Sequence, residues 1–173
     1  SMNREPLSNA DFALLRLDSS TNWMIVTALI TLESRLDSTR LNRVLEHSML
    51  RQPRFRQRIV QSRTLLGRAY WEDDASFLID QHIHCLHTPL PADTGLLEQL
   101  VSRLMSVGMD FSHPLWQVYL VEQYGSGSAL VMRIHHSIAD GISLAKMLLA
   151  MTTANPDESP GKLPAGPAKI NAP

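Results

Sequence analysis

The chain has 173 residues, of which 44% are hydrophobic and 19% are charged, and its formal net charge is −1. This length and composition are typical of one globular domain with a real core. The small net charge gives no bulk attraction to nucleic acid. A single cysteine, Cys85, excludes an internal disulfide. With no apolar run of about 18 residues and no visible secretory signal, these features favour a cytoplasmic protein.

The first half of the chain alternates helix and strand patterns. Ser8 fits the N-cap of a capping box in which Asp11 reaches back. Asp37 begins a second helix, which Pro53 ends. In chain order we expect a helix over residues 10–17, a strand over 23–32, a helix over 38–51, a strand over 55–61 and its hairpin partner over 66–72.

The second half contains a hairpin, and its composition changes after Ala154. We expect a strand over 79–86, a helix over 94–109, strands over 116–123 and 128–136 around a glycine-rich turn, and a last helix over 142–153. Five of the ten prolines follow, as in a linker or disordered tail. We therefore divide the chain into an N-terminal domain (1–154) and a Pro-rich tail (155–173), and we expect an α/β (α+β) fold.

The most informative motif is His135-His136-Ser137-Ile138-Ala139-Asp140-Gly141, where the last predicted strand ends. Because side chains alternate along a strand, His135 and His136 should point in opposite directions. Gly141 permits a sharp turn into the next helix. A neutral imidazole accepts a proton near pH 7. The pattern therefore indicates general base catalysis, in which one histidine removes the proton of an alcohol that attacks a carbonyl.

The HHxxxDG pattern resembles the signature of the chloramphenicol acetyltransferase-like superfamily, which includes the condensation domains of peptide synthetases. Four more stretches narrow the resemblance to bacterial wax ester synthase/diacylglycerol acyltransferases: Pro6–Asp11, Leu36–Leu41, Pro53–Arg58 and Pro114–Trp116. The resemblance runs from about residue 6 to about residue 151. It implies a two-layer sandwich with a mixed sheet. It also implies that this chain is an N-terminal half, whose active site is shared with a missing C-terminal domain.

The resemblance implies an O-acyltransferase that moves a fatty acyl group from acyl-coenzyme A to a long-chain alcohol or a diacylglycerol. His136 is then the general base and His135 supports it. Asp140 either orients His136 or pairs with a distant arginine that holds the loop, and Gly141 shapes the loop. The resemblance also places three residues near the substrate channel, for which core packing is a compatible interpretation: Pro114, Leu115 and Trp116.

No metal or prosthetic group is implied, because acyl-coenzyme A is a co-substrate. The expected partners are acyl-coenzyme A, the alcohol or diacylglycerol, and the C-terminal domain of the same protein, with no nucleic acid. Peripheral contact with a membrane or lipid droplet is compatible with these substrates. The 173 residues alone are expected to be inactive, because half of the channel is absent.

Several alternatives stay open. The same histidine serves a peptide-synthetase condensation domain, and a half-domain without its partner can be a non-catalytic module that binds lipid or protein. As metal ligands, His136 and Asp140 would give only two of the three or four that zinc needs. His82, His84 and His87 offer other imidazoles, and the strand face that His82 and His84 share is more typical of a solvated or partly packed edge. Six arginines suit either phosphate binding or a solvated strand face: Arg51, Arg54, Arg56, Arg58, Arg63 and Arg68.

Overall fold

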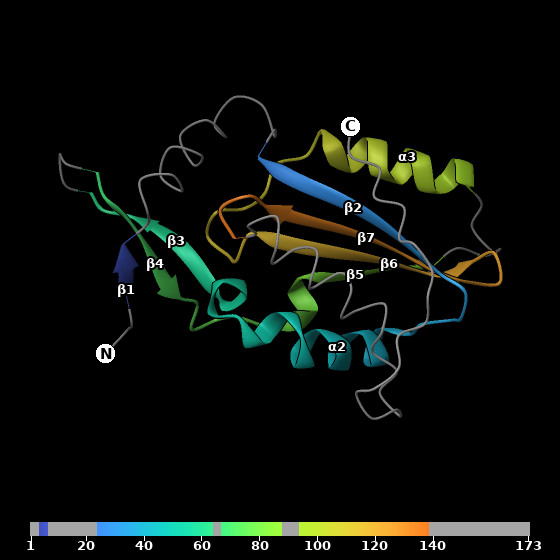
Figure 1. The fold of residues 1–173 in the computed structure, drawn as a ribbon. Coiled ribbons are helices and arrows are strands. Elements are labelled where there is room, and N and C mark those ends of the chain that lie inside the picture. Colours follow the sequence, from blue (N-terminus) through green and yellow to red (C-terminus); the bar gives the residue numbers. More distant parts are fainter. Residues whose placement is uncertain (1–3, 7–23, 64–66, 88–93, 139–173) are drawn as a thin grey trace.

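The computed structural model describes residues 4–6, 24–63, 67–87 and 94–138. This part of the chain forms two sheets and two α-helices, joined by short 3-10 helices labelled η (Figure 1). In chain order the elements are β1 (Arg4–Pro6), β2 (Ile25–Leu32), α2 (Ser38–His47), η1 (Met49–Arg51), η2 (Pro53–Arg56), β3 (Gln57–Gln61), β4 (Ala69–Asp73), η3 (Ile79–Gln81), β5 (Ile83–Leu86), α3 (Thr94–Met105), β6 (Trp116–Tyr124) and β7 (Gly127–His135).

The main sheet has the strand order β2-β7-β6-β5. It is mixed, because β5 pairs with β6 in parallel while the other neighbours are antiparallel. β6 and β7 form the predicted hairpin, and Gly125 at its turn has a φ of 56°, which glycine adopts without a steric penalty. The predicted α/β class with a mixed sheet is confirmed.

α2 and α3 cover opposite faces of this sheet (Figure 1). Side chains alternate along β6, so this strand contributes apolar residues to both faces of the main sheet. Trp116, Val118 and Leu120 belong to the core that includes α2, whereas Val121 packs with the leucines of α3. Full burial of each large apolar side chain contributes about 1.5 to 3 kcal/mol. The central strand β7 is therefore buried along its whole length.

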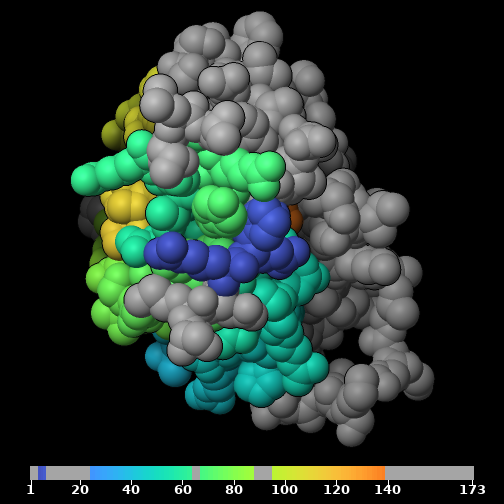
Figure 2. All heavy atoms as spheres, turned by 90° about the vertical axis from the view of Figure 1, so that its left-hand side faces the viewer, coloured from blue at the N-terminus to red at the C-terminus, as the bar shows by residue number. Residues whose placement is uncertain are grey.

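A smaller antiparallel sheet has the order β1-β4-β3. Figure 2 faces this end of the molecule, where β1 (dark blue) lies on the surface. The buried carboxylate of Glu72 joins all three strands through ion pairs with Arg4 (2.9 Å) and Arg58 (3.2 Å). Hydrogen bonding from Arg4, with a further contribution from Arg58, lowers the pKa of Glu72 despite its burial.

The helix α2 begins as predicted, because the Asp37 carboxylate accepts a hydrogen bond of 2.7 Å from the backbone N–H of Arg40. Its end differs from the prediction. The helix stops at His47 rather than Arg51, and the chain continues as η1. The Ser48 hydroxyl donates to the carbonyl of Val44, a local bond that competes with the helical pattern.

Three other predicted boundaries are also wrong in part. The strand expected over 55–61 begins only at Gln57, because Pro53 starts the 3-10 helix η2. Arg54 and Arg56 therefore do not share a strand face with Arg58. Residues 79–81 form η3 rather than strand, and α3 ends at Met105 rather than at residue 109. The predicted strands over 23–32 and 66–72 correspond to β2 and β4.

The helices expected over 10–17 and 142–153, the capping box at Ser8 and the tail over 155–173 lie outside the described residues. The division into a domain and a tail therefore stays a prediction. Within the described part of the chain, no helix combines the length and the apolar character needed to cross a membrane.

Candidate active site

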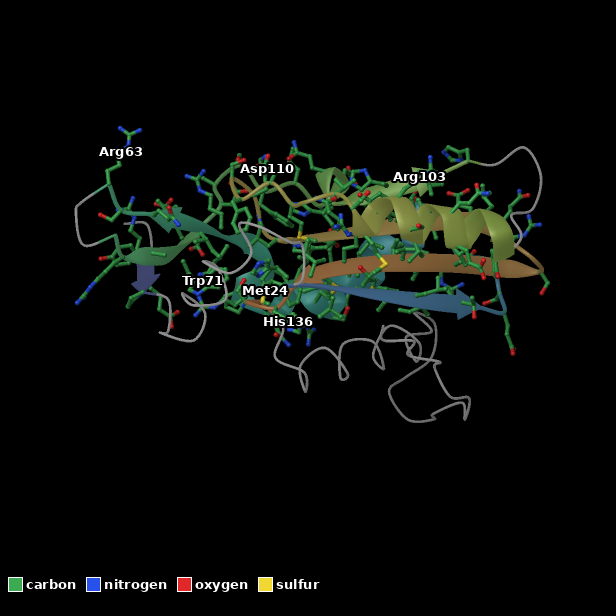
Figure 3. The ribbon with its side chains drawn as sticks, turned by 90° about the horizontal axis from the view of Figure 1, so that it is seen from above. Met24, Arg63, Trp71, Arg103, Asp110 and His136 are labelled. Carbon is green, nitrogen blue, oxygen red and sulfur yellow. The ribbon has the colours of Figure 1, made fainter. Side chains whose placement is uncertain are left out.

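The paired histidines stand where β7 leaves the main sheet. His135 is the last residue of β7 and pairs with Ile25 of β2. His136 follows, and its backbone N–H donates a hydrogen bond of 2.6 Å to the carbonyl of Met24. This bond extends the β2–β7 pairing by one step, so the backbone of His136 is held by the edge strand. Figure 3 shows Met24 and His136 close together at this end of the ribbon.

The two imidazoles have opposite environments, as the alternation of side chains predicts. His135 is fully buried, whereas the side chain of His136 is exposed. An exposed imidazole on a fixed backbone can meet a substrate and exchange a proton with it. A buried ring cannot do so without a rearrangement. Of the two, His136 is therefore the accessible base.

The ring of His135 is held by the turn that follows it. The backbone N–H of Ser137 donates to Nδ1 of His135 (3.1 Å), and the Ser137 hydroxyl lies 2.7 Å from the same nitrogen. Since a backbone N–H can only donate, Nδ1 is an acceptor and the ring proton of the neutral form is on Nε2. The N–H of Ile138 donates to the carbonyl of His135 (3.0 Å), which closes the turn around His136.

The segment before β6 packs against His135. The ring of Phe111 stands edge-on to His135, with centroids 5.8 Å apart and planes at 76°. The backbone N–H of His135 donates to the carbonyl of Leu115 (3.0 Å). The PLW stretch thus lies directly beside the paired histidines, as the predicted hairpin of residues 116–123 and 128–136 implies.

Pro114, Leu115 and Trp116 are all buried. Trp116 lies in the core, where its indole N–H donates to the carbonyl of Phe55 (2.8 Å) and its ring stacks on His82 at 4.6 Å. These contacts fit the packing interpretation, and contact with a substrate stays a prediction. Asp140 and Gly141 lie outside the described residues, so their placement relative to His136 is not described.

His82 and His84 do not share a strand face, because His82 precedes β5. His82 is buried between Trp116 and Phe77, and this burial lowers its pKa. His84 is exposed and bonds Gln117. Among the residues that the structure describes, no group of three or more metal-ligating side chains comes together.

The arginine-rich stretch is partly neutralised by the protein itself. Arg54 pairs with Glu5 (3.2 Å) and lies over the ring of Trp71, with 4.6 Å from its guanidinium carbon to the ring centroid. Arg58 pairs with Glu72. These guanidinium groups contribute to the fold of the small sheet, which is an alternative to the anion-binding role that their clustering suggested.

Arg133 is a functional candidate that the sequence did not single out. It is 2% exposed near the end of β7, two residues before His135. One of its terminal nitrogens donates to the carbonyl of Val107. Burial lowers the pKa of its guanidinium, and the neighbouring Tyr119 opposes this shift. The only sequence signal is a charge on the interior face of a strand that is otherwise apolar.

Comparison with known proteins assigns this chain to a family. The model of the wax ester synthase/diacylglycerol acyltransferase catalytic domain matches residues 7–171. A Mycobacterium tuberculosis (strain H37Rv) protein, whose name marks it as a candidate diacylglycerol O-acyltransferase, is 33% identical over 159 residues, which are 88% of this chain and 32% of that protein. Another protein of that strain, whose name also marks it as a candidate diacylglycerol O-acyltransferase, is 30% identical over 141 residues. These residues are 79% of this chain and 52% of that protein.

Solved structures show the same fold. The wax ester synthase/diacylglycerol acyltransferase from Marinobacter aquaeolei VT8 matches 90% of this chain and 40% of its own chain, with a TM-score of 0.69 and 26% identity. The starter condensation domain of rhizomide synthetase also has a TM-score of 0.69, at 14% identity, which shows the fold alone. The chain therefore spans between a third and about half of the length of these relatives.

Proposed function

Because the chain belongs to the wax ester synthase/diacylglycerol acyltransferase family, we propose that the complete protein is an acyl-coenzyme A-dependent O-acyltransferase. Its acceptor is a long-chain alcohol or a diacylglycerol. The observation that carries the proposal is the exposed imidazole of His136 at the end of a fully buried strand. The accessible base is thereby presented at the end of a strand that packs on both faces of the sheet.

In this proposal His136 accepts the proton of the acceptor hydroxyl as the oxygen attacks the thioester carbon. A C–O bond forms, and the resulting tetrahedral oxyanion collapses with cleavage of the C–S bond. The coenzyme A thiolate then takes the proton back from His136, so that an ester and free coenzyme A are released. General base catalysis of this kind contributes about 100- to 10,000-fold.

The remaining motif residues have supporting roles in the proposal. His135 is locked by Ser137 and supports the backbone from which His136 projects. Asp140 either orients His136 or holds the loop through an arginine, and Gly141 allows the loop to turn. The second wall of the channel comes from the C-terminal part of a longer protein, consistent with the share of the relatives that this chain covers.

The test uses the complete protein with labelled acyl-coenzyme A and a mixture of alcohols and diacylglycerol, with products identified by mass spectrometry. His136→Ala should lower ester formation by at least about 100-fold. The matched control is His47→Ala, which removes an exposed histidine at the end of α2. Equal activity of His136→Ala and the control, with unchanged circular dichroism, would remove His136 from the mechanism.

A condensation-type activity is the second candidate, because the HHxxxDG pattern also resembles the signature of peptide-synthetase condensation domains. It uses the same histidine but takes an acyl group from a carrier protein and delivers it to an amine. Offering free acyl-coenzyme A and carrier-loaded acyl groups in parallel separates the two. Turnover of only the carrier-loaded donor would reject the proposed reaction.

A further inference from the structure

Arg133 carries a positive charge in the interior without a carboxylate partner among the described residues. Its cross-strand neighbours, Thr27 and Gln117, are uncharged. Burial of an unpaired charge is unfavourable and is tolerated only where other groups solvate the ion. The groups that contact this guanidinium therefore indicate its role in the structure.

These contacts lie at the end of α3. The guanidinium donates to the carbonyl of Val107 and contacts the hydroxyl of Tyr119. Turn bonds from Ser106 to Arg103 and from Val107 to Leu104 continue the last turn of the helix up to this carbonyl. The C-terminus of a helix carries partial negative charge, so a cation is favourable there. Arg133 thus joins the centre of the sheet to the point where α3 ends.

The chain that leaves this point returns to the paired histidines. Arg133 and His135 lie on the same face of β7, because they are two residues apart. Between Val107 and β6, the chain places Phe111 against the His135 ring and the carbonyl of Leu115 on the His135 backbone N–H. The segment 107–115 is therefore anchored by Arg133 at one end and encloses His135 at the other.

We propose that Arg133 is a positioning residue, which holds segment 107–115 against His135 and thereby fixes the turn that presents His136. The inference rests on the proposed function, since it assigns Arg133 a role in that same site. Arg133 does not touch the reacting atoms. Its loss should leave the binding of substrate largely intact and misplace the base.

The experiment compares three variants of the complete protein. Arg133→Met removes the charge at similar volume, Arg133→Lys keeps a cation, and Arg103→Met is the matched control on the exposed face of α3 (Figure 3). Arg133→Met should lower kcat by about 100-fold with little change in KM, because a small displacement of a catalytic group has an effect of this size. Arg133→Lys should recover a large part of the loss.

Amide hydrogen exchange gives a readout that needs no turnover. In Arg133→Met, exchange should accelerate in segment 107–115 and in residues 135–138, but not in the small sheet or α2. If this variant does not fold, Tyr119→Phe removes only the hydroxyl contact and should produce a smaller fall in kcat of the same kind. Unchanged kcat and exchange in the folded variants would overturn the inference.

The two proposals fail in distinguishable ways. Full activity of His136→Ala refutes the proposed function, whatever Arg133 does. Loss of activity in His136→Ala together with normal kcat and exchange in Arg133→Met refutes only the positioning role. A rise of KM without a fall in kcat in Arg133→Met also refutes it, because Arg133 would then act on the binding of substrate and not on the placement of the base.

Discussion

Two fully buried tryptophans provide a direct test of how hydrogen bonding contributes to this fold. The indole N–H of Trp116 donates to the carbonyl of Phe55 (2.8 Å). The indole N–H of Trp71 is buried with no hydrogen-bond partner among the described residues. Replacement by phenylalanine removes a similar volume at both sites. It breaks a hydrogen bond at Trp116, whereas at Trp71 it removes an unpaired donor. We therefore expect Trp116→Phe to destabilise the protein more than Trp71→Phe.

The size of the difference follows from the polar groups. Both variants exchange an indole for a smaller ring and lose similar packing. Trp116→Phe also leaves the carbonyl of Phe55 buried and unpaired, which costs about 1 to 3 kcal/mol. Trp71→Phe removes a buried donor that is already unpaired, so it relieves a desolvation penalty of the same order. Loss of the Arg54 contact with the indole offsets about 1 kcal/mol of that gain. With about 2 kcal/mol for each of the two polar terms, the expected gap in the free energy of unfolding is about 3 kcal/mol.

Urea unfolding of the complete protein, followed by far-UV circular dichroism, measures this gap. With an m-value of about 2 kcal/mol/M, the two midpoints should differ by about 1.5 M. The m-values of the variants should agree, so that the midpoints report stability. A lower midpoint for Trp71→Phe than for Trp116→Phe, or equal midpoints, would refute the reasoning.

Two further predictions concern the small sheet and the hairpin. The pKa of Glu72 is lowered in the folded state, so its stabilising contribution is present above its unfolded pKa of about 4.3 and is lost as the pH falls through the folded value. Glu72→Gln should therefore be less stable than the parent at pH 7, with a difference in urea midpoint that narrows at pH 3. A difference independent of pH would contradict this, and Glu46→Gln is the control at an exposed position. Gly127→Ala should destabilise by about 3 kcal/mol, because its Cβ would lie 1.8 Å from the carbonyl oxygen of Leu32. Gly125→Ala, with open space but a φ of 56°, should cost only about 1 to 2 kcal/mol in thermal unfolding, and the reverse order would show that the backbone near Leu32 yields easily.

The sequence alone determined the features that depend on neighbouring residues. The hairpin of β6 and β7, the cap of α2 at Asp37 and the opposite exposure of His135 and His136 each follow from a period of two or from a cap–turn pattern. The HHxxxDG pattern indicated the superfamily, and four further stretches narrowed it to the family that the comparison shows. Such signals are local, so no knowledge of the packing is needed to detect them.

Tertiary structure decided what depends on residues far apart in the chain. The placement of Phe111 against His135, the burial of Arg133 under the end of α3 and the stacking of His82 on Trp116 join segments that no short pattern relates. The start of β3 also depended on context, because Phe55 is buried in the core as part of a 3-10 helix rather than a strand. The physical reason is that packing and charge solvation act between segments, and only the folded chain brings those segments together.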